Sequence, residues 1–352
     1  MSRSLRSTVG VVVAIGVVAA SCSGSLGSTF GGPAPVVSSS FVLAPSITSS
    51  VPHSGVRRIS SHRVVASKSY DVEYRESVAQ TRSGDFDVEC TEVITTSMSS
   101  RPQFELLHEA REGFIHRYRD FHVFDPALAG SNWEKTTTGN TKVVAGRACS
   151  ETHVERRLKS HSTLRHVEWD LYVDDQTGLV LEWKRYADGV LSDEGVYESI
   201  VYGEPTNYVA HVPSTNETEL DPSIDPQRAF TYEVAIPKVL PDGFVVKEMS
   251  KIVDRNTNDE YLKVVYTDGI EVCFFLFASD GTPLHSRPTT TGKGGTPVPP
   301  SGSTTTSGRD EIVYVMFGDI VVAQYDDGSH LMVVAGRLSL FDIQSMIESA
   351  MK

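Results

Sequence analysis

The chain has 352 residues, of which 39% are hydrophobic and 22% charged, and its formal net charge is −13 at pH 7. This length is enough for two domains, and the apolar content is enough for packed cores. The negative charge argues against nucleic acid as a partner, because nucleic acids are bound by basic patches. It also argues against simple electrostatic attachment to an anionic membrane surface.

Residues 1–22 have the layout of an export signal. Arg3 and Arg6 precede an uncharged apolar run at 9–20, which is too short for a membrane span of about 20 residues. Small residues then precede Cys22, which predicts a bacterial lipoprotein signal whose cysteine is lipidated. Ala19 replaces the commoner leucine, so plain cleavage that leaves Cys22 unmodified is the alternative. In both cases we expect an extracytoplasmic protein, in the periplasm or cell envelope, with a lipid anchor to the membrane in the first case.

Residues 23–64 are rich in Ser, Gly, Pro and Val, and we expect them to form a disordered tether. From 65 to 205, short runs of alternating apolar residues predict strands, and turn sequences such as Asp188-Gly189 separate them. Strands that meet at short turns are antiparallel neighbours. The predicted strands are 86–96, 104–111, 113–119, 142–148, 167–173, 180–186 and 198–202, with weak helix candidates at 69–79 and 125–129.

Residues 206–229 are rich in Pro, Asn and acidic residues and predict a linker. A second, smaller β-rich domain is expected over 230–352. Within it, residues 279–309 are almost entirely Gly, Pro, Ser and Thr, and they predict a disordered insertion because they can bury little apolar surface. Predicted strands of this domain are 244–249, 260–267, 270–277, 311–317, 320–325 and 330–334.

The chain ends on a predicted helix that packs against the second sheet. Ser339 and Asp342 form a capping box at its start. Phe341, Met346 and Ile347, together with Ala350, recur on roughly one helical face, which we expect to be buried.

Besides Cys22, the chain contains Cys90, Cys149 and Cys273. Disulfides form in the oxidising compartments outside the cytoplasm. Cys90 and Cys149 fall in predicted strands of the same domain, and they are the favoured pair. The alternative is three unpaired thiols, because a free cysteine packs well as a small hydrophobic residue.

No catalytic motif is present in the sequence: G-x-S-x-G, H-E-x-x-H and C-x-x-C are all missing. His161 and His166 are five residues apart and would point to opposite faces of a strand, which is poor geometry for one metal. His116 and His122 could share a face but have no cysteine or carboxylate cluster beside them. We therefore expect no catalytic residue, no metal and no cofactor. An envelope hydrolase is the minor alternative, and it would need a nucleophile and a base in contact.

Aromatic residues gather in the first domain, where Trp169 and Trp183 are placed to line the interior of one curved sheet. The simplest interpretation is an ordinary core. The alternative is a cavity for an acyl chain or a hydrophobic peptide.

Short phrases occur in a fixed order along the chain. The phrases are V-A-G-R at 144–147, W-D-L-Y-V-D-D-Q-T-G-L-V-L at 169–181, Y-A-D-G-V-L at 186–191, L-P-D-G-F at 240–244, Y-T-D-G-I at 266–270, M-F-G at 316–318 and M-V-V-A-G at 332–336. In this order they resemble the MucB/RseB family of periplasmic sigma-E regulatory proteins, although Val180 and Arg337 depart from the proline and the acid usual there.

The resemblance implies an α+β fold of two domains. The first would be a curved antiparallel half-barrel with a helix, like that of lipoprotein carriers, and the second a smaller β domain with a C-terminal helix. It also implies a non-enzymatic protein that binds the extracytoplasmic segment of a membrane anti-sigma factor, or another envelope peptide, and responds to envelope lipids. The alternative function is a lipid or lipoprotein carrier or chaperone. The resemblance identifies no contact residues.

Overall fold

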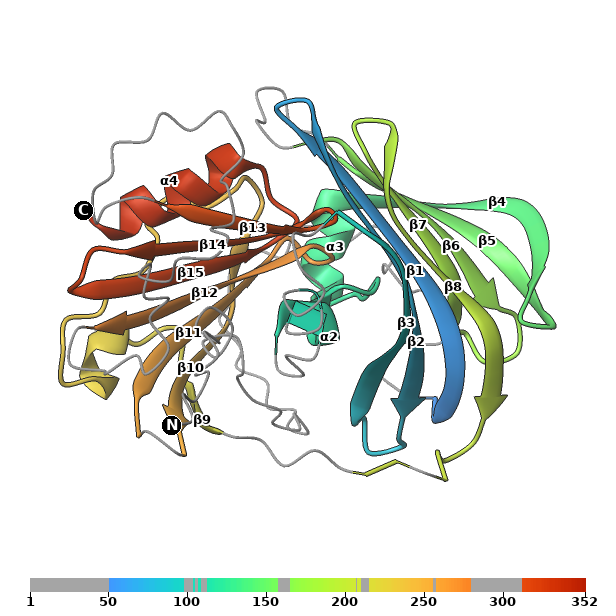
Figure 1. Ribbon diagram of the computed structural model, residues 1–352, viewed down its shortest axis with the longest axis horizontal. Helices are drawn as coiled ribbons and strands as arrows, with labels where there is room; N and C mark the ends of the chain where they lie inside the picture. The colour runs from blue at the N-terminus through green and yellow to red at the C-terminus, as the bar shows by residue number, and fades with distance from the viewer. Residues whose placement is uncertain are drawn as a thin grey trace, which may run out of the picture.

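The computed structural model describes residues 51–97, 104, 107–108, 113–157, 165–206, 208–209, 215–255, 258–279 and 312–352. The predicted signal, Cys22, most of the predicted tether and residues 280–309 of the predicted insertion lie outside these ranges. The elements, labelled as in Figure 1, are β1 (His53–Val65), β2 (Lys68–Gln80), β3 (Phe86–Thr96), α2 (Phe114–Tyr118), α3 (Pro126–Asn132), β4 (Trp133–Val144), β5 (Arg147–Arg156), β6 (Val167–Asp174), β7 (Val180–Ala187), β8 (Val190–Tyr202), β9 (Thr215–Leu220), the 3₁₀ turn η2 (Pro226–Ala229), β10 (Val245–Asp254), β11 (Glu260–Thr267), β12 (Val272–Ser279), β13 (Val313–Phe317), β14 (Ile320–Asp326), β15 (His330–Gly336) and α4 (Leu340–Ala350).

The first domain is one curved antiparallel sheet of eight strands, in the order β3-β2-β1-β8-β7-β6-β5-β4. The second domain is an antiparallel sheet of seven strands, in the order β13-β14-β15-β12-β11-β10-β9. Helices α2 and α3 lie between the two sheets, and α4 covers the far face of the second sheet (Figure 1). Neither sheet closes into a barrel. The predicted α+β fold of two domains, with a half-barrel first, is confirmed.

Strand β12 is apolar on both faces because both faces are covered. Cys273, Phe275 and Phe277 pack in the core on the α4 side of the sheet. Phe274 and Leu276 point the other way, and the Phe274 ring centre is 6.2 Å from that of Phe114 in α2. A strand buried on both faces has a continuous apolar sequence, which explains why residues 272–277 of the strand predicted at 270–277 are all apolar.

The two domains share one hydrophobic core. Phe317, at the end of β13, stacks on Phe104 with ring centres 5.2 Å apart, and it lies 5.9 Å from Tyr74 of β2. All three side chains are fully buried, and they belong to a cluster that also contains residues of β6, β7 and β12. The sheets are therefore packed on each other and do not behave as separate bodies on a linker.

The predicted tether extends too far, because its last residues form β1 in the middle of the first sheet. The strand alternates correctly, but its buried face carries Arg57, Ser61 and Arg63 beside the apolar Ile59. A strand whose inward positions are polar does not show the alternation of apolar and polar residues by which strands are predicted. The first domain thus begins at His53 and not at residue 65.

Other predicted boundaries also change. The weak helix candidate at 69–79 is wrong, because this segment alternates with period two and forms β2. The predicted strand at 113–119 is the helix α2, and in the predicted strand at 104–111 the described residues are helical. The predicted strand at 142–148 is instead the end of β4, a hairpin turn at 145–146 and the start of β5, and the predicted linker contains β9, which pairs with β10. The helix candidate at 125–129 is confirmed as α3, with Asp125 as its N-cap.

Helix α4 has the predicted cap, because the Ser339 hydroxyl accepts from the backbone N–H of Asp342 at 3.0 Å. Its predicted buried face is wrong at one position: Phe341 is 67% exposed, whereas Ile343 is fully buried with Met346 and Ile347.

The different exposure of Phe341 and Ile343 leads to a prediction about the stability contributed by α4. Ile343→Ala should lower the free energy of unfolding by about 3 kcal/mol, because it leaves a cavity between the helix and the sheet. Phe341→Ala should change it by less than about 0.5 kcal/mol, because its ring is mostly in solvent. Urea unfolding of both variants checks the assignment, and equal losses would contradict it.

Candidate functional site

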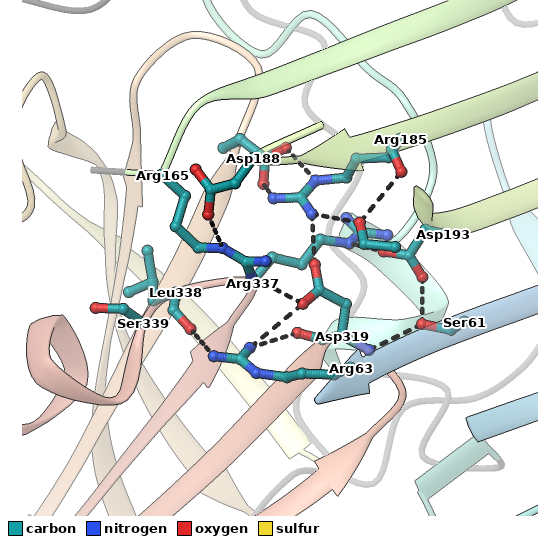
Figure 2. Close-up of polar contacts among 12 residues, drawn as sticks. Ser61, Arg63, Arg165, Arg185, Asp188, Asp193, Asp319, Arg337, Leu338 and Ser339 are labelled. Atoms are coloured by element: carbon teal, nitrogen blue, oxygen red, sulfur yellow. Dashed lines mark hydrogen bonds and ion pairs between the residues drawn. The ribbon is translucent and has the colours of Figure 1, made fainter. Parts of the chain in front are cut away.

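The second domain contacts the first through the turn between β13 and β14, and Asp319 lies in that turn. Its carboxylate is fully buried and contacts three arginines of the first domain (Figure 2). Arg63 of β1 donates to the Asp319 carbonyl at 2.9 Å and lies 3.5 Å from Oδ1. Arg165 donates to Oδ1 at 3.2 Å, and Arg185 of β7 donates to Oδ2. The buried negative charge is therefore compensated by positive charge from the other domain.

A second ion pair crosses the junction beside Asp319. Arg337, which follows β15, donates from Nε to Oδ2 of Asp193 in β8 at 2.6 Å (Figure 2). The other oxygen of Asp193 accepts from the hydroxyl of Ser61. Ser61 Oγ in turn accepts from the backbone N–H of Asp319 at 2.9 Å. One hydroxyl of β1 thus connects the Asp193 carboxylate to the backbone of Asp319 in a single network.

Arg185 extends the network to the turn between β11 and β12. Its Nε lies 2.9 Å from Oε1 of Glu271, and both side chains are buried. Burial alone would raise the pKa of Glu271, but the charges of Arg185 and Arg337 lower it. The pKa of Arg185 is raised by its acidic neighbours although burial opposes this. Both groups are charged at neutral pH, so the junction is held by ion pairs.

The same turn is fixed on its other side by α3 and β5. Arg156 donates to the carboxylate of Asp268, and Asn132, the last residue of α3, donates to the Asp268 carbonyl at 2.9 Å. The backbone N–H of Phe124 donates to the carbonyl of Gly269 at 2.9 Å. These bonds place the tip of the turn against the start of α3.

A further buried charge cluster lies behind the junction in the first domain. Glu76 of β2 is fully buried, and its Oε1 is 2.6 Å from Nε of Arg57 and 2.6 Å from Nη2 of Arg119. His108 Nε2 lies 2.9 Å from the other oxygen. Burial would raise the pKa of Glu76, but Arg119 and Arg57 hold it well below its usual value. The carbonyl of Arg119 accepts from Arg337, which connects this cluster to the junction.

The low pKa of Glu76 leads to a prediction about how the stability of the folded protein depends on pH. Because this pKa is lower in the folded than in the unfolded protein, the charge stabilises the fold above the unfolded pKa of about 4.3. That contribution is lost as the pH falls toward the folded pKa. Glu76→Gln should therefore destabilise the protein at pH 7, and the difference from the wild type should shrink between about pH 5 and pH 3.

Urea unfolding at several pH values measures this effect. Glu73→Gln on the same strand is the matched control, because Glu73 pairs at 3.2 Å with Arg58 and both side chains are partly in solvent. Exposed pairs contribute little, so this variant should follow the wild type throughout. A Glu76→Gln difference that is independent of pH would contradict the assignment.

The structure brings the two predicted tryptophans together. Trp169 and Trp183 are both buried, with ring centres 5.7 Å apart, and Phe121 lies 5.3 Å from Trp169. The indole of Trp183 lies against Gly195, where a Cβ would come within 2.5 Å of the ring. The guanidinium of Arg337 lies 5.6 Å from the centre of the Trp169 ring. The aromatic pair therefore faces the junction.

The predicted disulfide is not formed. Cys149 of β5 is a buried free thiol, and burial raises its pKa to about 11. Cys90 is on β3, and five strands of the sheet lie between β3 and β5. Placement in the same domain was not enough, because a disulfide needs Cα atoms within about 7 Å. Cys273 is a buried free thiol in the other sheet.

Reasoning from the sequence missed the junction residues themselves. Arg185 is separated from Trp183 and Leu181 by two and four residues along β7, so its side chain points to the same, inward face. Strand alternation alone predicts this orientation. Its partner Asp319 is 134 positions away, and nothing local connects the two. The sequence therefore indicates that a charged residue lies at a core position of β7, but it does not indicate which residue compensates the charge.

No family model matches the chain, and no curated protein matches it. Solved structures do match. MucB alone is 16% identical with a TM-score of 0.43, and the match covers 85% of this chain and 91% of that one. The complex of Pseudomonas aeruginosa MucA/MucB is 16% identical with a TM-score of 0.41 and the same coverage. MucB in complex with MucA(peri) is 15% identical with a TM-score of 0.41, covering 85% and 92%.

In the part of the chain that the structure describes, no helix is long and apolar enough to cross a membrane. The matching structures are of MucB, in the family that the sequence phrases resemble, and this chain is similar to them over most of its length.

Proposed function

We propose that the chain is a non-enzymatic binding protein of the cell envelope, which holds the extracytoplasmic segment of a membrane anti-sigma factor. The observation that carries the proposal is where the family-like phrases fall in the fold. Y-T-D-G-I provides the turn with Asp268, M-F-G leads into Asp319, and M-V-V-A-G ends directly before Arg337. Y-A-D-G-V-L contains Asp188, which pairs with Arg165 at 3.2 Å.

The phrases of the second domain therefore lie in or directly beside turns that contact the first domain. Gly243, in L-P-D-G-F, belongs to this set, because its carbonyl accepts from Asn132 at 3.3 Å. A fixed relation between two domains is what a protein needs when its ligand contacts both of them. It also reduces the ordering cost of binding an extended segment, because the binding surface is already assembled.

Solved structures similar to this chain include MucB in complex with MucA(peri). For the present chain we propose the same class of partner, the periplasmic part of a single-pass membrane protein. The lipid anchor predicted at Cys22 would keep the two domains near such a partner. It would act by raising the local concentration and would add no contact.

Cross-linking in native membranes, followed by mass spectrometry, tests the proposal. We expect capture of a single-pass anti-sigma factor through its extracytoplasmic segment. Asp319→Asn, which weakens the domain junction, should reduce the capture, whereas Asp188→Asn should not. Recovery of lipids without any anti-sigma factor would contradict the proposal and favour a carrier.

The carrier function is kept as a second candidate because Trp169 and Trp183 do lie together on the inner side of the first sheet. An acyl chain would enter beside these rings, at the junction. Native mass spectrometry of protein purified from membranes would show a bound acyl species, and Trp183→Ala would reduce its occupancy.

A further inference from the structure

A second polar cluster lies on the face of the first sheet that points away from the core. Glu155 of β5 and Glu168 of β6 are directly opposite each other in the strand register. Their chain neighbours Val154, Val167 and Trp169 are buried on the other face, whereas the two glutamates are partly in solvent. Like charges directly opposite on adjacent strands repel, so a cation between them would stabilise this pair.

His166 lies between the two carboxylates. Its Nε2 is 2.8 Å from Oε1 of Glu155, and its Nδ1 is 3.0 Å from Oε1 of Glu168. A neutral imidazole has one N–H and can donate to only one of these groups. Both glutamates form ion-pair contacts with this one ring. A metal ion held between the ring and the two carboxylates would supply the positive charge that this pair of glutamates lacks in a neutral imidazole.

We propose that Glu155, His166 and Glu168 form a binding site for a divalent transition metal of the zinc class. One ligand atom from each residue lies within 4.8 Å of the others. Zinc is coordinated by imidazole nitrogen and carboxylate oxygen at about 2.0–2.2 Å, so small side-chain rotations bring the three atoms around one ion. Two carboxylates balance its charge. Magnesium and calcium prefer sites built from oxygen, and the histidine disfavours them.

The spacing of His161 and His166 argued against a metal shared by those two residues, and His161 lies outside the residues that the structure describes. The ligands that accompany His166 are instead carboxylates, one of them from the neighbouring strand. All three side chains retain exposure, between 28% and 48%, so an ion can enter and water can complete its coordination. This site is independent of the proposed partner binding.

The site also lies next to the domain junction. The backbone N–H of His166 donates to Asp188 at 3.0 Å, and the adjacent Arg165 reaches Asp319. A metal bound on the outer face of the sheet would therefore hold His166, the residue directly before β6. The adjacent Arg165 is held at the junction by Asp319.

Isothermal titration of Zn²⁺ into the purified, untagged full chain tests the proposal. We expect saturable binding to the wild type, and His166→Gln and Glu168→Gln should each weaken it by at least about tenfold, because each removes one of three protein ligands. X-ray absorption of the zinc-loaded protein should show one imidazole nitrogen and oxygen ligands, without sulfur. Titration of Mg²⁺ should show no comparable binding.

The matched control is His153→Gln on the same pair of strands. His153 is directly opposite Asp170 and lies 2.8 Å from its carboxylate, and among the described residues its one ion-pair contact is with that single carboxylate. This variant should bind Zn²⁺ like the wild type. The proposal is overturned if the wild type binds no Zn²⁺, if sulfur is found at the metal, or if the His166 and Glu168 variants bind as tightly as the His153 variant.

Discussion

Asp319→Asn is expected to lower the free energy of unfolding by about 3–5 kcal/mol, because it removes one partner from a buried set of ion pairs. The fully buried carboxylate compensates Arg63, Arg165 and Arg185, and two of these arginines are themselves buried. Asparagine has nearly the same shape but no charge, so Arg63 would lose its ion pair and the buried Arg185 would keep only the one with Glu271. Urea unfolding followed by tryptophan fluorescence measures the loss.

Asp188→Asn is the matched control for this experiment. Asp188 pairs with the same Arg165 at 3.2 Å, but its side chain is 59% exposed. Surface ion pairs contribute little, and asparagine tolerates the positive φ of 54° at this position. We expect a loss of less than about 1 kcal/mol. Equal losses in the two variants would show that the burial of Asp319 has no special role in joining the domains.

Gly269→Ala is expected to destabilise the protein by roughly 3 kcal/mol or more, through backbone strain and a steric clash. Gly269 has a φ of +108°, which disfavours any residue with a side chain. A Cβ there would lie 2.3 Å from the backbone nitrogen of Ala129 in α3. The turn would have to withdraw from the first domain, and its bond with Phe124 would be lost.

Gly189→Ala separates the effect of backbone strain from the effect of the steric clash. Gly189 follows an aspartate in a hairpin turn, as Gly269 does, and has a φ of +73°, but nothing lies within 4 Å of its added Cβ. Only the backbone strain remains, about 1–2 kcal/mol. Thermal unfolding of both variants gives the comparison. If Gly189→Ala costs as much as Gly269→Ala, the close approach of the second domain to α3 is not what stabilises the junction.

These two Asp-Gly turns also show the limit of local reasoning. The sequence predicts a tight hairpin tip at both positions. Asp188-Gly189 is such a two-residue tip between β7 and β8, whereas Asp268-Gly269 begins a four-residue turn that packs against another domain. Turn chemistry is decided by the residues of the turn itself and is readable from them. What the turn touches is decided elsewhere in the chain.

The same division applies to the charged residues. An arginine at an inward position, such as Arg185, can be recognised from strand alternation, but its acidic partners are 86 and 134 positions away. The predicted Cys90–Cys149 pair failed for a related reason, because the order of strands in a sheet does not follow from their order in the chain. Trp169 and Trp183 were placed together correctly because they lie on sequential strands joined by one short turn.

The sequence by itself determined the two-domain β architecture, most strand positions and the capped C-terminal helix, because alternation, turn residues and caps act over a few residues. It did not reveal β1, whose inward face carries Arg57, Ser61 and Arg63. Only the tertiary structure decided that these polar residues are interior ones, because burial of a charge is favourable only where distant segments supply its partner. The domain junction and the Glu155–His166–Glu168 cluster therefore became visible only once the strands were in register.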